Sequence, residues 1–163
     1  MPYAYGNYIR QFCSKISGKF MIDLDIAKSR LFKKKLTLSI VKNNEILFET
    51  VSDKISGFLY AIDKLGAKLE GSSVADRVAG KAVALLCVYV KVKAVYADVL
   101  SKNAKAVFER NSIQLEWKSL VANILDLNQS EICPFEKAAM EISNPIKAYL
   151  CFRALSKSFG SSC

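Results

Sequence analysis

The chain contains no histidine. This absence excludes a Ser-His-Asp triad, a Cys-His nucleophile pair and a histidine-ligated zinc ion. Acid–base chemistry would therefore fall to Asp, Glu, Lys, Tyr or Cys side chains. We expect neither a metal ion nor a cofactor.

Prolines and glycines are also scarce, with 3 and 7 among 163 residues, so most of the chain should be regular structure. The cysteines are odd in number, widely spaced and without a CxxC pair, which argues against a disulfide framework and for a reducing cytoplasm. They are Cys13, Cys87, Cys133, Cys151 and Cys163.

Long apolar runs are absent as well. The longest, residues 82–90, is too short to span a bilayer and is flanked by Lys81 and Lys91. The N-terminus has no continuous apolar stretch of the kind found in secretory signals. We expect a cytoplasmic protein that does not enter a membrane.

What remains is a globular composition, 52% hydrophobic and 24% charged, with a formal charge of +9. Residues 1–35 hold 8 basic and 2 acidic residues and include the run Lys33, Lys34 and Lys35. Such a run could bind nucleic acid or another anionic surface. A solvated helix end is favoured, because no interleaved aromatic and basic residues follow it.

The hydrophobic pattern predicts one domain, residues 23–155, between an N-terminal extension (1–22) and a flexible tail (156–163). Asp23 is placed to cap a first helix. The stretch "KLTLSIVKNNEILFETV" alternates around Asn43 and Asn44, which predicts a β-hairpin with a two-residue turn.

Further along, residues 56–66 predict a helix that ends at Gly66. Residues 74–89 are apolar nearly all round, which predicts a buried helix. Residues 93–100 predict a central parallel strand, and Ser101 is placed to cap the helix after it. A strand then covers 113–117, and helices begin at Pro134 and at Asn144. This order predicts a mixed sheet with helices on both faces.

Gly80-Lys81 resembles part of a phosphate loop, but Lys81 is followed by Ala82 rather than Ser or Thr, and Gly71 lies too far upstream. We therefore reject a phosphate loop. On a helix, Asp76, Arg77 and Lys81 would form its polar end. Gly80 would then mark a close approach of a backbone or a ligand, or else only a tight helix crossing in a salt-bridged helix start.

The second constellation is Cys133-Pro134-Phe135-Glu136. A Cys at a helix N-cap lies near unsatisfied backbone N–H groups, which lower a thiol pKa. This pattern predicts a reactive thiolate or an anion site. An ordinary helix start, with Glu136 in a capping box and a buried Cys133, explains it equally well.

Four stretches taken together resemble a small prokaryotic family, the domain of unknown function 1893. They are "LTLSIVKNNEILFE", "SVADRVAGKAVALL", "VKAVYADVLSKNAKAVFERNSI" and "ICPFEKAAMEISNP". The resemblance covers about residues 23–150. It implies a three-layer α/β/α sandwich similar to the cytidine deaminases. The recurring polar residues of the family match Asp76, Gly80, Lys81, Cys133, Pro134 and Glu136, and Arg77 stands where a Lys is typical.

Deamination does not follow from this resemblance. Zinc deaminases need an H-x-E and a P-C-x-x-C motif, and neither is present. The resemblance implies instead a pocket for a small or nucleotide-related ligand. In that pocket Cys133, Lys81, Asp76 and Glu136 would be the catalytic candidates, with Arg77, Gly80 and Pro134 binding ligand. The alternatives are a non-catalytic module that binds nucleic acid or protein, and a scaffold that forms homodimers.

Overall fold

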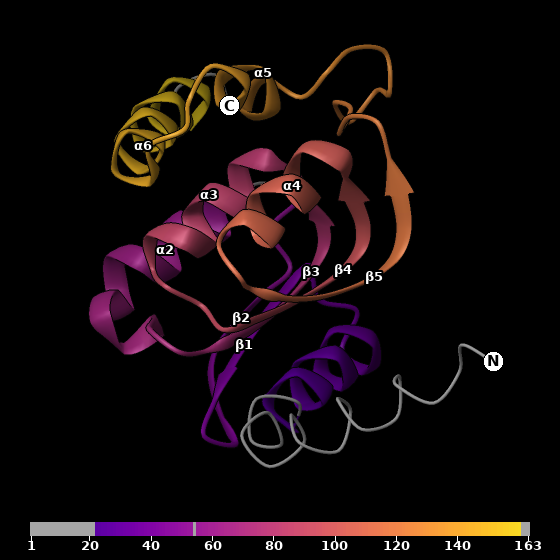
Figure 1. The fold of residues 1–163 in the computed structure, drawn as a ribbon, viewed down its shortest axis with the longest axis vertical. Coiled ribbons are helices and arrows are strands. Elements are labelled where there is room, and N and C mark those ends of the chain that lie inside the picture. The colour runs from indigo at the N-terminus through magenta and orange to yellow at the C-terminus, as the bar shows by residue number, and fades with distance from the viewer. Residues whose placement is uncertain (1–21, 54, 161–163) are drawn as a thin grey trace, which may run out of the picture.

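A computed structural model describes residues 22–53 and 55–160. Its centre is a five-stranded mixed sheet with the strand order β2-β1-β3-β4-β5 (Figure 1). The strands are β1 (Leu38–Lys42), β2 (Glu45–Thr50), β3 (Ser73–Ala79), β4 (Ala94–Ser101) and β5 (Gln114–Val121).

Strands β1 and β2 form the predicted antiparallel hairpin. Asn43 and Asn44 make its turn with φ angles of 54° and 66°. Asparagine tolerates this left-handed conformation, which two-residue hairpin turns require. The hairpin prediction is confirmed, turn residues included.

The other half of the sheet is parallel. Strand β1 pairs antiparallel with β3, while β3, β4 and β5 run parallel. Helix α3 (Lys81–Tyr89) and helix α4 (Lys102–Arg110) connect these parallel strands. As predicted, β4 lies in the middle of the parallel part, and Ser101 Oγ accepts a hydrogen bond from Ala104 N at the start of α4.

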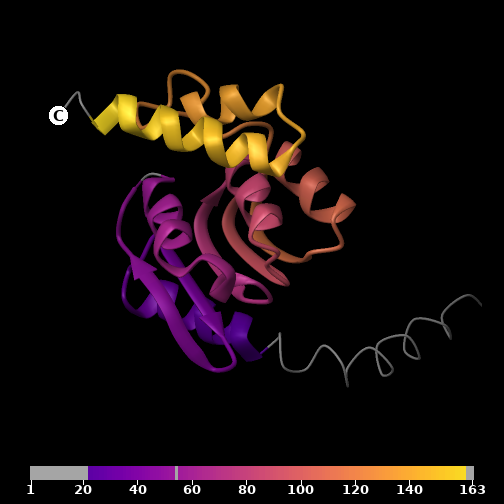
Figure 2. The same cartoon turned by 90° about the vertical axis from the view of Figure 1, so that its left-hand side faces the viewer.

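Helices cover both faces of the sheet (Figures 1 and 2). Of the described helices, the one at 22–33 covers one face, where Leu24, Ala27 and Leu31 pack in one cluster with strand residues that include Val41 and Tyr96. The opposite face carries α2 (Ser56–Leu65), the 3-10 turn η1 (Gly66–Leu69), α3, α4, α5 (Pro134–Met140) and α6 (Pro145–Gly160). No helix among the described residues is long and apolar enough to cross a membrane.

The predicted helix over residues 74–89 is wrong in its first half. Residues 73–79 form β3, and the helix begins only at Lys81. The neighbours Asp76 and Arg77 break any alternation in this strand, and only Gly80 separates its apolar residues from the apolar helix that follows, so periodicity does not separate the two elements. The sheet therefore has one more strand than the pattern predicted.

The ends of the domain also differ in detail. Helix α6 runs to Gly160, so residues 156–160, predicted as part of a flexible tail, continue this helix. The predicted extension lies outside the described residues except for residue 22, which is helical.

Asp23 does not have the predicted role at the start of a helix. Its side chain is buried and accepts hydrogen bonds from the backbone N–H groups of Asn43 (2.9 Å) and Asn44 (2.7 Å). The carboxylate therefore ties the N-terminal helix to the hairpin turn. The cap prediction failed because Asp23 meets donors from a segment 20 residues away.

We expect Asp23→Asn to lower the free energy of unfolding by about 1–3 kcal/mol, because charge-assisted hydrogen bonds from two backbone N–H groups to a buried carboxylate are weakened. Denaturant unfolding measures this loss. Asp25→Asn on the same helix is the matched control, since Asp25 is exposed and should change stability little. Equal effects of the two substitutions would contradict the clamp.

Candidate functional site

A pocket of about 590 Å³ lies where β3 ends and α3 begins. This is the carboxyl end of a parallel strand, where open α/β sheets commonly bind ligands. The walls are mainly apolar and come from β1, α2, α3, the segment before α5, α5 and α6. They include Leu38, Phe58, Val83, Ile124, Phe135 and Phe159.

The pocket brings together most of the residues singled out from the sequence. Two segments more than 50 positions apart face the same space, as the resemblance implied. The predicted residues that line it are Asp76, Arg77, Gly80, Cys133, Pro134 and Glu136. Lys81 is not among the lining residues.

Glu136 is the most buried charged group of this set, with an exposed fraction of 2%. It lies in the first turn of α5. Its Oε1 accepts a hydrogen bond of 3.0 Å from Ser101 Oγ, and Ser101 in turn caps α4. The carboxylate therefore contacts the N-terminal end of α4 while belonging to the first turn of α5.

The Glu136 carboxylate also lies close to the start of a third helix, α3. Gly80 is the N-cap of this helix. A methyl group at this position would lie 2.9 Å from Glu136 Cδ and 2.9 Å from Ile124 Cγ1. The close approach predicted for Gly80 is thus made by a carboxylate rather than by a ligand or a backbone. A negative charge at helix N-termini is electrostatically favourable.

The geometry around Gly80 and Lys81 also argues against a phosphate loop. Gly80-Lys81 does follow a strand and opens a helix, contrary to the helical environment expected. However, only Gly80 separates β3 from α3, and the Glu136 carboxylate lies against it. A phosphate would meet this carboxylate in place of free N–H donors.

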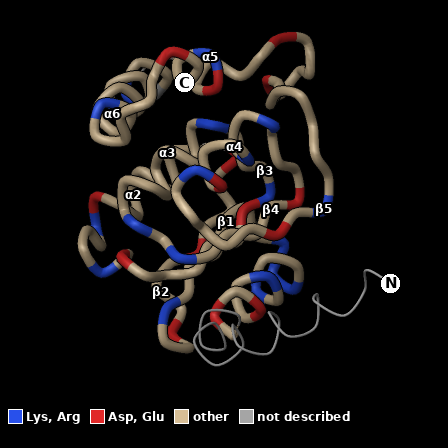
Figure 3. Tube along the Cα trace, in the orientation of Figure 1, with Lys and Arg blue, Asp and Glu red and all other residues tan. Residues whose placement is uncertain are grey.

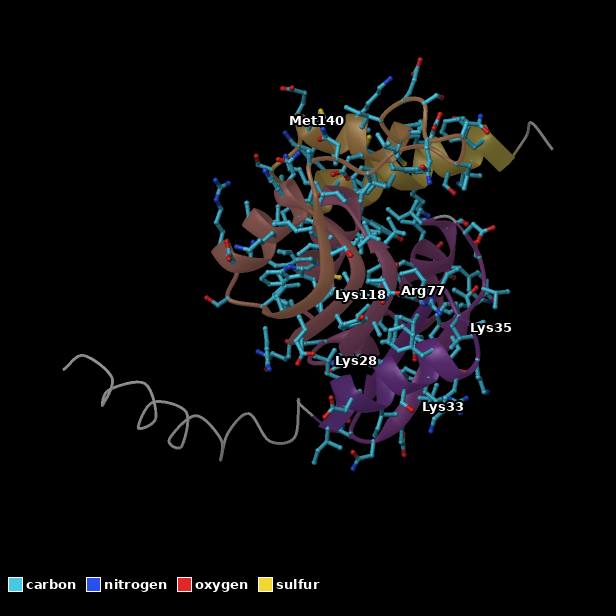
Figure 4. The ribbon with its side chains drawn as sticks, turned by 90° about the vertical axis from the view of Figure 1, so that its right-hand side faces the viewer. Lys28, Lys33, Lys35, Arg77, Lys118 and Met140 are labelled. Atoms are coloured by element: carbon cyan, nitrogen blue, oxygen red, sulfur yellow. The ribbon has the colours of Figure 1, made fainter. Side chains whose placement is uncertain are left out.

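Lys81 does not act on Cys133. Its Nζ donates a hydrogen bond of 2.8 Å to the Met140 carbonyl at the C-terminal end of α5, on the outer side of the molecule (Figure 4). Cys133 is the N-cap at the opposite end of this helix, about 10 Å away along its axis. The predicted pairing of a lysine with an activated thiol is therefore not formed.

Arg77 is one of the residues that line the pocket, but its guanidinium forms its hydrogen bonds on the other face of the sheet. Nη1 donates to Asp98 Oδ2 at 2.6 Å, Nε donates to the Leu36 carbonyl at 3.0 Å, and Nη2 donates to the Leu31 carbonyl at 3.2 Å. The group also lies 5.0 Å from the Phe32 ring centroid. It fastens the end of the N-terminal helix, so its charge is not directed at a pocket ligand.

Among the predicted site residues, Asp76 has the side chain whose pKa is shifted most. It is partly buried in the middle of β3, and Oδ1 accepts a hydrogen bond of 2.9 Å from Val78 N. Burial raises the pKa of Asp76 from 3.8 to about 7, with a smaller contribution from nearby Asp98. Hydrogen bonds from the backbone N–H groups of Val78 and Arg77 oppose this rise without cancelling it. Such a group exchanges protons near neutral pH.

Cys133 is half-buried beside the pocket. Its backbone N–H donates to the Ile124 carbonyl at 3.0 Å, and its side chain caps no helix N–H. Cys87 belongs to the core, as predicted, and burial raises the pKa of its thiol. The position of Cys133 at a helix start is confirmed, whereas its reactivity stays a prediction.

Two further acidic residues of the pocket were missed. Asp126 accepts hydrogen bonds from Ser130 N and Ser130 Oγ, and the first of these lowers its pKa most. Asp53 is exposed at the rim. The spacing of Asp126 and Ser130 is a turn signal that could have been noticed, but nothing in the sequence placed this turn beside β3. Among the described residues, no cluster of His, Cys, Asp or Glu could hold a metal ion.

The comparisons agree with this architecture. The family described as "Domain of unknown function (DUF1893)" matches residues 26–155. The chain belongs to this family. The crystal structure of a DUF1893 family protein from Thermotoga maritima is similar, with a TM-score of 0.75 and 26% identity over 83% of this chain and 90% of that one. No curated protein matches the sequence.

We expect Gly80→Ala to lower the free energy of unfolding by about 1–3 kcal/mol, because the added methyl group forces Glu136 and Ile124 aside. In a Glu136→Ala background the cost should be smaller by about 1 kcal/mol, since one of the two obstacles is gone. Unfolding curves of the four proteins measure this coupling. Additive effects would contradict the contact.

The raised pKa of Asp76 predicts a pH dependence of stability. Between pH 3.8 and about 7 the folded state binds more protons at this group than the unfolded state does. The free energy of unfolding should therefore fall as pH rises through this range and level off above it. Asp76→Asn should remove this part of the slope and be more stable than the native protein at pH 8. A variant that keeps the native slope would show that Asp76 is not the group involved.

Proposed function

We propose that the chain binds a small organic molecule with an apolar body and a cationic or hydrogen-bond-donating group in the pocket beside Asp76. The observation that carries this proposal is a carboxyl group with a pKa of about 7 in a largely apolar pocket of about 590 Å³. This volume is in the range of small-molecule sites, and a few polar groups among apolar walls usually orient the ligand.

The charges of the pocket support a cationic rather than an anionic group. Its acidic lining residues are Asp53, Asp76, Asp126 and Glu136. Among the described lining residues Arg77 is the one basic residue, and its guanidinium is bound by Asp98 and two carbonyls. A nucleotide phosphate would thus meet several carboxylates and no free cation among the described residues. Of the nucleotide-related ligands, we therefore propose only a nucleoside or a base that carries no phosphate.

Asp76 is the residue that we propose for proton exchange with the bound molecule. Glu136 is less suited to this role, because its carboxylate is buried, accepts a hydrogen bond from Ser101 and lies against Gly80. Cys133 remains a candidate nucleophile, but any activation must come from a group other than Lys81.

We also propose that the fold of the chain is similar to that of the cytidine deaminases. The hairpin, the parallel strands and the helices on both faces support it. We do not propose deamination, because the helices that begin at Ser56 and Lys81 carry neither the H-x-E nor the P-C-x-x-C motif. Fold alone does not carry the reaction.

Nucleic acid binding through the basic N-terminal segment gains no support from the described residues. Lys28 pairs with Glu116 at 2.6 Å, and Arg30 and Lys34 both pair with Glu49. In this segment the acidic residues Asp23 and Asp25 precede all the basic ones (Figure 3). Paired charges attract phosphates less than a free basic stripe would. A cytoplasmic location stays a prediction.

The test compares ligands of one shape and three charges: benzylamine, benzyl alcohol and benzoate. We expect benzylamine to bind best, with an affinity that rises with pH through about 7 as Asp76 ionises. Asp76→Asn should weaken this binding about tenfold, the loss of one charge-assisted contact. Titration calorimetry measures the affinities, and Asp25→Asn is the control outside the pocket.

A second readout places the ligand in the pocket. Bound amine should slow the alkylation of Cys133, which lines the pocket, and leave the half-buried Cys151 of α6 unchanged. Tighter binding of benzoate than of benzylamine would refute the charge argument. Protection of neither cysteine would show that the amine binds elsewhere.

A further inference from the structure

Strand β5 forms one edge of the described sheet (Figures 1 and 2). Gln114 N donates to the Lys93 carbonyl, so the backbone of residue 114 faces β4. The register with β4 then continues without a shift to Val121. Because backbone groups alternate along a strand, those of Leu115, Trp117 and Ser119 point away from the sheet. They form a row of donors and acceptors that no described strand pairs.

The charges along β5 are complementary to those of a second copy of the same strand that runs antiparallel to it. Residues 116, 117 and 118 are Glu, Trp and Lys. In an antiparallel pair of two such strands with Trp117 at the centre, each Glu116 lies opposite Lys118 of the second copy. We propose that two copies of the chain associate through β5 about a two-fold axis at Trp117, joining their sheets into one.

The backbone permits this register. Residues that exchange both hydrogen bonds across an antiparallel pair must point toward each other. With Trp117 at the centre, Trp117 meets its own copy and Leu115 meets Ser119, and all three residues have outward backbone groups. Glu116 and Lys118 then form the pairs without hydrogen bonds, in which side chains lie closer together.

Other registers lose this complementarity. A centre at residue 115 places Glu116 opposite Gln114, and a centre at 119 places Lys118 opposite Leu120. Centres at 116 or 118 would require inward-pointing backbone groups. The opposite sheet edge, β2, has Glu45 and Glu49 as its only charged residues. Pairing two β2 strands around residue 47 would set these carboxylates against each other.

The side chains of β5 are available for such a contact. Trp117 and Leu120 each expose 41% of their surface. Lys118 is exposed and makes no ion pair with another described residue, and Glu116 is partly exposed beside Lys28 (Figure 4). An unpaired lysine on an edge strand discourages pairing with most strands. A glutamate opposite it removes that obstacle for a second copy of this chain.

This interface is independent of the proposed ligand site, since no residue of β5 lines the pocket. The symmetry is also the commonest among homo-oligomers. Failure of the ligand proposal would leave the dimer proposal untouched, and the reverse also holds.

Sedimentation velocity of the full chain over a range of concentrations tests the proposal. We expect the native protein to dimerise, and Glu116→Lys or Lys118→Glu alone to weaken the dimer at least about tenfold by setting like charges opposite each other. The double variant Glu116→Lys/Lys118→Glu should restore the dimer. Circular dichroism of each variant verifies that its monomer is folded.

Ser119→Pro is an orthogonal variant, since it removes an outward N–H donor and leaves the bonds to β4 in place. It should also yield monomers. Trp117 is the only tryptophan of the chain, so its fluorescence should change with concentration in the native protein and not in Ser119→Pro. A native protein that is monomeric at every concentration would overturn the proposal, as would a dimer that the single charge reversals leave intact.

Discussion

The buried carboxylate of Glu136 is the interaction on which the site depends. It belongs to the first turn of α5, accepts a hydrogen bond from the residue that caps α4, and lies against the N-cap of α3. The positive ends of three helices thus meet one negative charge. This charge belongs to the chain itself, so the helix ends are satisfied before any ligand arrives. It is also the reason why we propose cationic or neutral ligands for a pocket that lies at a typical anion-binding position of α/β folds.

Adjacent residues of β3 serve opposite faces of the sheet. Asp76 lines the pocket, and Arg77 fastens the helix at 22–33 through Leu31, Leu36 and Asp98. This division of roles requires a strand, because successive side chains of a strand point in opposite directions. On the predicted helix the two groups would have formed one polar end. The wrong secondary structure therefore grouped Arg77 with Lys81, although their side chains contact different segments of the chain.

Local signals predicted much of the fold. The Asn43-Asn44 turn, the helix end at Gly66, the cap at Ser101 and the helix start at Cys133-Pro134 were all visible, because each depends on the conformational preference of one or two residues. Strand β3 was not visible, since Asp76 and Arg77 lie side by side and break its alternation, and its apolar residues run on into those of α3. The roles of Asp23, Arg77 and Lys81 depend on carbonyl and N–H groups of distant segments, which periodicity does not locate. The meeting of Asp76 and Cys133 came from the family resemblance and not from the pattern itself.

The residues that line the pocket lie between Thr37 and Phe159 in the sequence, and none of them comes from β4, α4 or β5. Asp76 reaches its partly buried position only when the hairpin, α2 and the late segment around Ile124 and Phe135 have all assembled around β3. A partly assembled chain, with its sheet formed but α5 and α6 undocked, would leave this carboxyl group hydrated and titrating as an ordinary aspartate. The pKa of the Asp76 carboxyl group therefore reports whether α5 and α6 have docked onto the sheet and the first helices.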